Sequence, residues 1–212
     1  MKKLFVLVLS SLMIFSLTAC GSSNTVNSTS PLKQEAATVT SKAVAASSQT
    51  SEDKTANGKG KKILVAYFSH SGNTKRVAEQ IHNLAGGDMF EIKTVAPYPT
   101  GYQEAVEVAK KEKETNARPQ LSTKVGNMAD YDVIFIGYPI WWHTAPMPIY
   151  TFLESYDLSG KTVIPFCTSG GSDISESMDA IKSICPSANI LEGLTANDAS
   201  KIEPWLSRIG MR

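Results

Sequence analysis

Residues 61–212 contain short hydrophobic runs separated by stretches in which polar and apolar positions alternate with helical spacing. The apolar runs, which predict strands, cover residues 63–68, 90–95, 133–138, 163–167 and 189–191. The amphipathic stretches predict helices over about residues 73–85, 101–116, 147–155, 174–184 and 198–209. Runs that are apolar at every position suit strands covered on both faces, and regular alternation of strand and helix indicates parallel pairing with right-handed crossovers. We therefore predict an α/β fold in three layers, a doubly wound parallel sheet of five strands in the order 2-1-3-4-5.

Two prolines fit this pattern poorly. Pro165 falls within a predicted central strand, where the missing N–H group is disfavoured. Pro204 interrupts the last predicted helix, so we expect that helix to restart with Pro204 in its first turn.

Residues 1–20 have the pattern of an export signal that ends in a cysteine. Lys2 and Lys3 precede the apolar stretch Leu4–Leu17, which is shorter than the roughly 18 residues that a membrane span needs. Small residues before Cys20 resemble the bacterial lipoprotein box, which makes Cys20 the lipidated first residue of the mature chain. The alternative is an ordinary cleavage site with a chance cysteine. We expect a lipid-anchored protein on the extracytoplasmic face of the cell membrane.

Residues 21–60 differ in composition from the rest of the chain. They are rich in Ser, Thr, Ala, Asn and Lys and contain no aromatic residue, which predicts a disordered tether. Residues 61–212 have the length of one domain and carry fifteen Lys and Arg against seventeen Asp and Glu, a net charge of −2. Because no basic stripe with interleaved aromatic residues is present, we expect no nucleic-acid partner. We also expect no metal site.

Two cysteines remain within the predicted domain. Export permits a disulfide, but Cys167 ends a predicted strand and Cys185 closes the helix that runs back along the sheet. A bridge requires Cα atoms within about 7 Å, and these positions fall at opposite ends of the layer. We expect two free, mostly buried thiols.

Three unusual loops follow the first, third and fourth predicted strands. In a doubly wound sheet, ligands bind beyond the carboxyl ends of the strands, where the strand order reverses. The candidate binding residues are Ser69, His70, Ser71, Gly72, Asn73 and Thr74 in the first loop, Pro139, Ile140, Trp141, Trp142 and His143 in the second, and Thr168, Ser169, Gly170, Gly171 and Ser172 in the third. Hydroxyls and freed backbone N–H groups in the first loop suit an anion at a helix N-terminus.

Each loop also has a simpler interpretation. The first is compatible with a helix cap and turn, the second with a hydrophobic plug or a partner-binding patch, and the third with a flexible turn. Together, however, a phosphate site, an aromatic wall and a hydrogen-bonding loop indicate a pocket for a planar heterocycle with a phosphorylated tail.

The first loop, Ser69-His70-Ser71-Gly72-Asn73-Thr74, resembles the phosphate loop of the flavodoxins, Thr/Ser-x-Thr/Ser-Gly-Asn-Thr, at every defined position. Residues 137–142 and 165–172 are similar to small flavodoxin-like proteins that often occur in exported or anchored forms. The resemblance covers nearly all of residues 61–212. It implies non-covalent FMN, with the phosphate on residues 69–74, Trp141 stacked on the flavin ring and residues 168–172 at its pyrimidine end.

The chain also departs from the family pattern. Residues 170–173 offer no second aromatic ring, and the domain is nearly neutral where flavodoxins are strongly acidic, which implies a less negative potential and a more open flavin. His143 is a candidate catalytic proton donor, although a hydrogen bond to backbone is an equal alternative. Tyr98 and Tyr102 follow the second strand within reach of the pocket rim, but we expect Tyr102 to pack its helix against the sheet.

These observations indicate a membrane-anchored, extracytoplasmic FMN protein that transfers electrons to or from an envelope partner, either a redox protein or a membrane quinone. One alternative is an FMN-dependent reductase of quinones or similar planar acceptors. An alternative of another class is a non-catalytic flavin-binding lipoprotein.

Substitution of Cys20 tests the predicted lipid anchor. Because lipidation needs the thiol that follows the cleavage site, Cys20→Ser should abolish membrane retention and leave a soluble or unprocessed form. Fractionation of membranes with and without detergent measures this. If the variant still requires detergent for release, the lipoprotein hypothesis is wrong.

Overall fold

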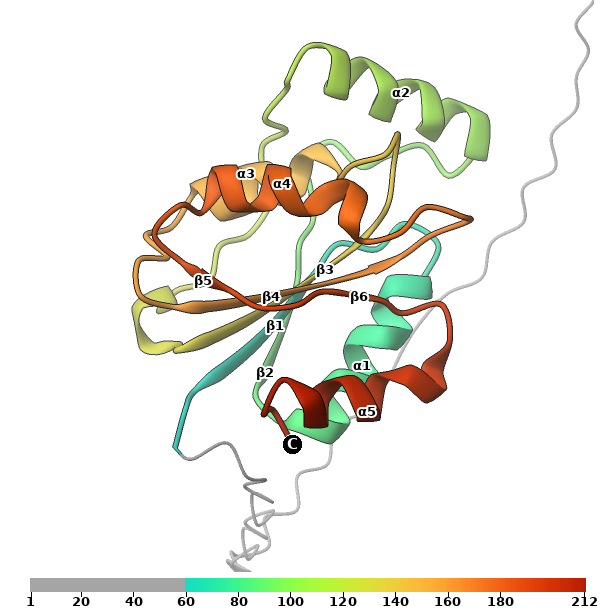
Figure 1. The fold of residues 1–212 in the computed structure, drawn as a ribbon. Coiled ribbons are helices and arrows are strands. Elements are labelled where there is room, and N and C mark those ends of the chain that lie inside the picture. Colours follow the sequence, from blue (N-terminus) through green and yellow to red (C-terminus); the bar gives the residue numbers. More distant parts are fainter. Residues whose placement is uncertain (1–59) are drawn as a thin grey trace, which may run out of the picture. The chain divides into compact units, whose positions relative to one another are not determined.

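A computed structural model describes residues 60–212, which form a parallel sheet between helices (Figure 1). The strands are β1 (Ile63–Tyr67), β2 (Asp88–Glu91), β3 (Val133–Pro139), β4 (Thr162–Thr168), β5 (Asn189–Ile190) and β6 (Leu194–Thr195). They pair in the order β2-β1-β3-β4-β5, with β6 also on β4, so the predicted fold class and order are confirmed. The predicted signal peptide, Cys20 and the tether up to residue 59 lie outside the described residues.

Helices cover both faces of the sheet. They are α1 (Asn73–Ala85), α2 (Tyr102–Glu114), α3 (Met147–Glu154), α4 (Ser175–Ile184) and α5 (Ile202–Arg208), with short 3₁₀ turns at Met128–Asp130 and Ala199–Lys201. Helices α1 and α5 lie on one face and α3 and α4 on the other, while α2 lies farther out on the α3 side (Figure 1). Within the described range, no helix combines the length and apolar character that crossing a membrane requires.

The central strands are buried on both faces, which explains their unbroken apolar sequences. Leu64, Ile134 and Ile136 pack into the core under α3 and α4. Phe135 and Trp205 belong to the second core, under α1 and α5, with ring centroids 5.9 Å apart. Full burial of such a side chain contributes about 1.5–3 kcal/mol, so these two cores hold the sheet between its helices.

Two strand predictions were wrong in detail. The second strand covers Asp88–Glu91 and not residues 90–95, because Gly86 and Gly87, both with positive φ, turn the chain so that it enters the sheet at Asp88. After Ile92 donates its N–H to the Tyr67 carbonyl, the chain leaves the sheet, and Val95 is 57% exposed. The predicted fifth strand, residues 189–191, corresponds to β5. The additional strand β6 was not predicted, because a strand of two residues is too short to show a hydrophobic pattern.

The two prolines are accommodated by breaks in regular structure. Val163 and Cys167 direct their carbonyls to Leu191 and Ala196, so the intervening Pro165 faces the gap between β5 and β6. The missing N–H of Pro165 therefore falls where no strand pairs. Pro204 lies in the first turn of α5, which restarts after the 3₁₀ turn, as predicted.

Both cysteines of the domain are free and buried, as predicted. Burial raises the pKa of the Cys167 thiol to about 12 and that of Cys185 to about 11. Because the thiolate is the reactive form, neither group is poised for chemistry at neutral pH.

One glycine of β3 leaves room for the neighbouring strand's side chain. A Cβ at Gly137 would overlap the ring of Phe166, whereas a Cβ at Gly126 meets open space. We expect Gly137→Ala to destabilise the domain by about 1–3 kcal/mol through overpacking, and Gly126→Ala to change stability little. Denaturant unfolding of both variants measures the difference. Equal stability of the two would contradict this packing.

Candidate functional site

The three predicted loops meet at the carboxyl end of the central strands. Phe68 donates its N–H to the Gly137 carbonyl and Ile140 donates to the Thr168 carbonyl, both at 2.9 Å. The buried hydroxyls of Thr74 and Thr168 lie 2.9 Å apart and join the first loop to the third. The structure therefore brings the loops 69–74, 139–145 and 168–173 together, as the sequence predicts.

The first loop presents an open helix N-terminus. Gly72 precedes α1 with φ +85° and has no side chain to cap the helix, and no acidic residue stands in the first turn. Ser69 Oγ accepts a hydrogen bond from the Lys75 N–H at 3.2 Å, and Asn73 Nδ2 donates to Ser71 Oγ at 3.2 Å. Arg76 donates to the Asn73 side-chain oxygen. Uncapped N–H groups, hydroxyls and a guanidinium at the positive end of a helix favour an anion.

The second loop contains a strained turn. Trp141 and Thr144 exchange both backbone hydrogen bonds, at 3.0 and 3.1 Å, around Trp142 and His143. These two central residues have φ of +50° and +64°, a type I′ pattern usually filled by Asn and Gly. Left-handed backbone at non-glycine residues costs on the order of 1–3 kcal/mol each and is found at functional sites. The turn fixes the directions of two large side chains.

The two tryptophans of this loop have different surroundings. Trp141 is half-buried and meets Phe68, His70 and Tyr98 edge-on, with centroid distances of 5.4, 5.8 and 5.1 Å. His70 is itself fixed, since its Nε2 donates to the Pro99 carbonyl at 2.8 Å. Trp141 is therefore a braced aromatic wall.

Trp142 instead connects the turn to α2. Its Nε1 donates to the Val106 carbonyl at 3.1 Å, and its own carbonyl accepts from Lys113 Nζ at 2.6 Å. Lys110 Nζ lies 5.5 Å from the centroid of its ring, within cation–π range. The indole remains 39% exposed.

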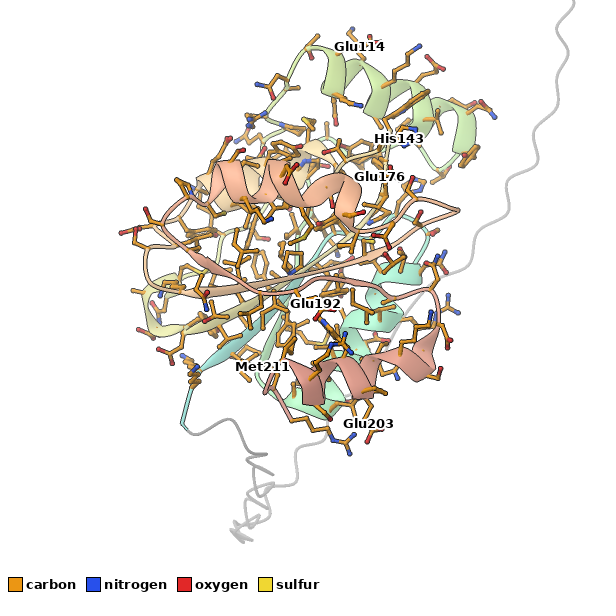
Figure 2. All side chains as sticks on the ribbon, in the orientation of Figure 1. Glu114, His143, Glu176, Glu192, Glu203 and Met211 are labelled. Carbon is orange, nitrogen blue, oxygen red and sulfur yellow. The ribbon has the colours of Figure 1, made fainter. Side chains whose placement is uncertain are left out.

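His143 pairs with a carboxylate and not with backbone, so the alternative of a hydrogen bond to backbone is wrong. Its Nδ1 lies 2.7 Å from Glu176 Oε2, while the side chain is 76% exposed. Figure 2 labels both side chains, which lie close together near the N-terminal end of α4. The hydrogen bond with His143 lowers the pKa of the Glu176 carboxyl, and Ser172 adds to this effect. With Nδ1 occupied, Nε2 is the nitrogen left for a ligand.

The third loop is held by Thr195, the last residue of β6, and by Asn197, which follows it. Asn197 Oδ1 accepts from the Ser169 N–H at 2.9 Å, and Asn197 Nδ2 donates to the Ser169 carbonyl at 2.8 Å. Thr195 Oγ1 donates to Asp173 Oδ2 at 2.8 Å and accepts from the Ile174 N–H at 2.8 Å. The backbone and side-chain hydrogen bonds from Ser175 lower the pKa of the Asp173 carboxyl. The glycine-containing loop is thus clamped at both ends.

Two adjoining cavities open between these loops. The larger, about 870 Å³, lies between α1, the third loop and residues 196–199. The smaller, about 370 Å³, lies between α2 and the second loop. Predicted site residues that line one or both are His70, Ser71, Asn73, Thr74, Pro139, Ile140, Trp141, Trp142, His143, Thr168, Ser169, Gly170 and Ser172. Ser69, Gly72 and Gly171 lie in the same loops without lining either cavity.

A second set of lining residues was not predicted from the sequence. They are Arg76, Val77 and Gln80 on α1, Ala105, Val106 and Ala109 on α2, and Ala196, Asn197 and Ala199 after β6. Arg76 lies two residues after the first loop, and this closeness in the sequence was the one local indication that any of them belongs to the site. The others reach the site only through the fold.

The two tyrosines that follow β2, Tyr98 and Tyr102, have different surroundings. Tyr102 is 75% exposed and lines both cavities, so the prediction that it packs α2 against the sheet is wrong. It is the first residue of α2, whose buried face consists of Ala105 and Ala109. Tyr98 donates to the Glu112 carboxylate, and burial, followed by this hydrogen bond, raises the pKa of its hydroxyl.

Comparisons with known proteins agree with this geometry. A family model described as flavodoxin matches residues 62–209. A solved structure of a candidate flavoprotein from Bacteroides eggerthii is 42% identical over 70% of this chain and 98% of its own, with a TM-score of 0.63. A second candidate flavoprotein, from Bacteroides uniformis, is 37% identical over 70% of this chain and 99% of its own, with a TM-score of 0.64.

A flavoprotein from Lactobacillus acidophilus, solved in complex with FMN, is 25% identical over 68% of this chain and 98% of its own, with a TM-score of 0.58. The comparison with curated proteins finds no match.

The pairing of His143 with Glu176 can be measured by titration. His143→Ala removes the main cause of the lowered pKa, so the pKa of the Glu176 carboxyl should rise toward its ordinary value of 4.5. Carboxyl carbon chemical shifts followed between about pH 2 and 7 by NMR report it. Glu154, whose pKa is lowered by Arg118, should not change. An unchanged Glu176 titration would contradict the pairing.

Proposed function

The chain belongs to the flavodoxin family, and from this premise we propose that it binds FMN non-covalently and transfers electrons through it. The observation that carries the proposal is one continuous site with an open helix N-terminus at one end and the Trp141 wall beside it. The FMN complex of the Lactobacillus acidophilus relative supports the choice of flavin.

The residues of the larger cavity fit this cofactor chemically. Among the described residues that line this cavity, Arg76 is the one charged residue, and none carries a carboxylate. Ser71 and Asn73 add a hydroxyl and an amide beside the uncapped N-terminus of α1, a donor set suited to a phosphate dianion. A volume of about 870 Å³ is within the usual range of roughly 300–1,000 Å³ for ligand pockets.

The chain's own residues would set the properties of the bound ring. FMN supplies the redox centre when bound. Trp141, braced by three edge-on aromatic contacts, offers an apolar face that favours the neutral oxidised ring over an anionic reduced one and so lowers the potential. The third loop, clamped by Asn197, presents Ser169 and Gly170 at a fixed position for hydrogen bonds.

We place this activity at the extracytoplasmic face of the cell membrane, with Cys20 as the lipid-bearing residue. The support is the sequence Lys2-Lys3, the apolar stretch Leu4–Leu17 and the small residues before Cys20. A redox protein of the envelope or a membrane quinone would then be the partner.

The second cavity favours a second candidate function, an FMN-dependent reductase of small molecules. A one-electron carrier needs only an exposed cofactor edge. The space of about 370 Å³ beside Trp141 is instead suited to a small acceptor.

Binding of FMN by the refolded, flavin-free protein tests the proposal. Riboflavin, which lacks the phosphate, should bind at least tenfold more weakly than FMN, because the donors of the first loop would be left without their anion. Arg76→Ala should weaken FMN binding and leave riboflavin binding unchanged. Fluorescence titration measures all four affinities, and equal affinity of the protein for the two flavins would contradict a phosphate site.

The aromatic wall is tested in the same assay. Trp141→Ala removes a ring contact worth on the order of 1 kcal/mol, so FMN should bind roughly fivefold more weakly, regain fluorescence and show a higher potential. Trp142→Ala is the matched control, since that indole lies against α2. If Trp142→Ala changes affinity and fluorescence while Trp141→Ala does not, the wall has been assigned to the wrong residue.

A further inference from the structure

The smaller cavity has a composition unlike that of the larger one. Its α2 wall consists of small apolar side chains, Ala105, Val106 and Ala109, and it faces the indoles of Trp141 and Trp142. The described residues that line it include two imidazoles, His70 and His143, but no Lys, Arg, Asp or Glu, so no permanently charged group is present to pair with a charged ligand and a neutral one is favoured. Indole walls favour a flat, conjugated ring.

The wall made by the second loop is held rigidly. Trp142 is bound to α2 through its Nε1 and its carbonyl, and His143 is bound to α4 through Glu176. Both residues have left-handed backbone that the surrounding contacts must hold in place. The position of His143 at the cavity is therefore set by contacts on two sides.

We propose that this cavity binds a neutral, planar dicarbonyl compound of the quinone class, and that His143 donates a proton to it from Nε2 while Glu176 positions the imidazole. The proposal rests on the proposed function, because the electrons come from bound FMN. It assigns to the site a substrate class, a proton donor and a positioning residue.

The reaction balances with one proton from the protein. Reduction of a quinone to a hydroquinone takes two electrons and two protons. Bound reduced FMN would supply the electron pair and one proton, and the His143 imidazolium would donate the second proton to the other carbonyl oxygen. Solvent then reprotonates the ring, which is 76% exposed.

Glu176 has a defined role in this step. As a carboxylate at 2.7 Å it accepts the Nδ1–H of His143, which orients the ring and stabilises the imidazolium. The other groups near His143 are His70 and Tyr102 in the cavity wall and Lys110 and Lys113, which contact the neighbouring Trp142. Among these described neighbours, Glu176 is the one anion, so its removal should leave the imidazole without the carboxylate that orients it.

The purified full chain, loaded with FMN and reduced with one equivalent of dithionite, tests the proposal. Anaerobic mixing with 2-methyl-1,4-naphthoquinone should reoxidise the flavin about 100-fold more slowly in His143→Gln, the scale of general acid catalysis. Glu176→Gln should lower the limiting rate with the quinone and leave its half-saturating concentration unchanged, because Glu176 orients the imidazole but does not line the cavity. Asp179→Asn, farther along α4, is the matched control and should match the unmodified chain. Ferricyanide accepts an electron without a proton, so it should react equally fast with all four proteins.

Occupancy of the cavity is tested separately. Val106→Phe, which fills the α2 side, should raise the quinone concentration that half-saturates the rate and leave ferricyanide unaffected. In the chain holding oxidised FMN, the quinone should shift the methyl NMR signals of Ala105 and Ala109 without releasing flavin.

Two results would overturn the proposal. Quinone rates equal to those of the unmodified chain in both His143→Gln and Glu176→Gln at every pH would exclude the proton transfer. Displacement of FMN by the quinone would show that the cavity is part of the flavin site.

The proposed function fails by a different observation, loss of flavin from the protein on gel filtration. In that case the methyl shifts of Ala105 and Ala109 still decide whether the quinone binds.

Discussion

The parallel pairing of β1, β3 and β4 is the constraint on which the whole site depends. Each of these strands is buried on both faces, so its register is fixed by two hydrophobic cores as well as by backbone hydrogen bonds. Their carboxyl ends finish at one edge, where the bonds Phe68 to Gly137 and Ile140 to Thr168 extend the pairing into the loops. A cofactor site assembled from three separate segments is thereby held by the most stable part of the domain.

The two cavities differ in the charged residues that line them, and therefore in the ligands that they suit. Among the described residues, the larger has a single cation, Arg76, beside a helix N-terminus, whereas the smaller has two histidines, His70 and His143. Neither lining includes a described carboxylate. This arrangement suits an anionic cofactor in one cavity and a neutral molecule in the other, with Trp141 belonging to both.

The sequence was sufficient where the signal is local. Continuous apolar runs predicted the central strands, and the first loop was recognised because its hydroxyls, glycine and amide stand next to one another at 69–74. Residues that depend on tertiary contacts were not predictable. Asn197 bonds Ser169 from 28 positions further along the chain, and α2 contacts the second loop through the bond from Trp142 to Val106. The partner of His143 was missed for the same reason, since Glu176 is thirty-three positions away.

The buried Cys167 has a consequence for how the domain behaves under oxidising conditions. It directly precedes Thr168 of the site, yet burial raises the pKa of its thiol to about 12, so the thiol stays protonated at neutral pH. The thiolate is the nucleophile that attacks peroxides and disulfides, so this thiol, one residue from a redox site, behaves as an inert apolar side chain. The domain can therefore retain a cysteine at this position without forming mixed disulfides or covalent dimers through it.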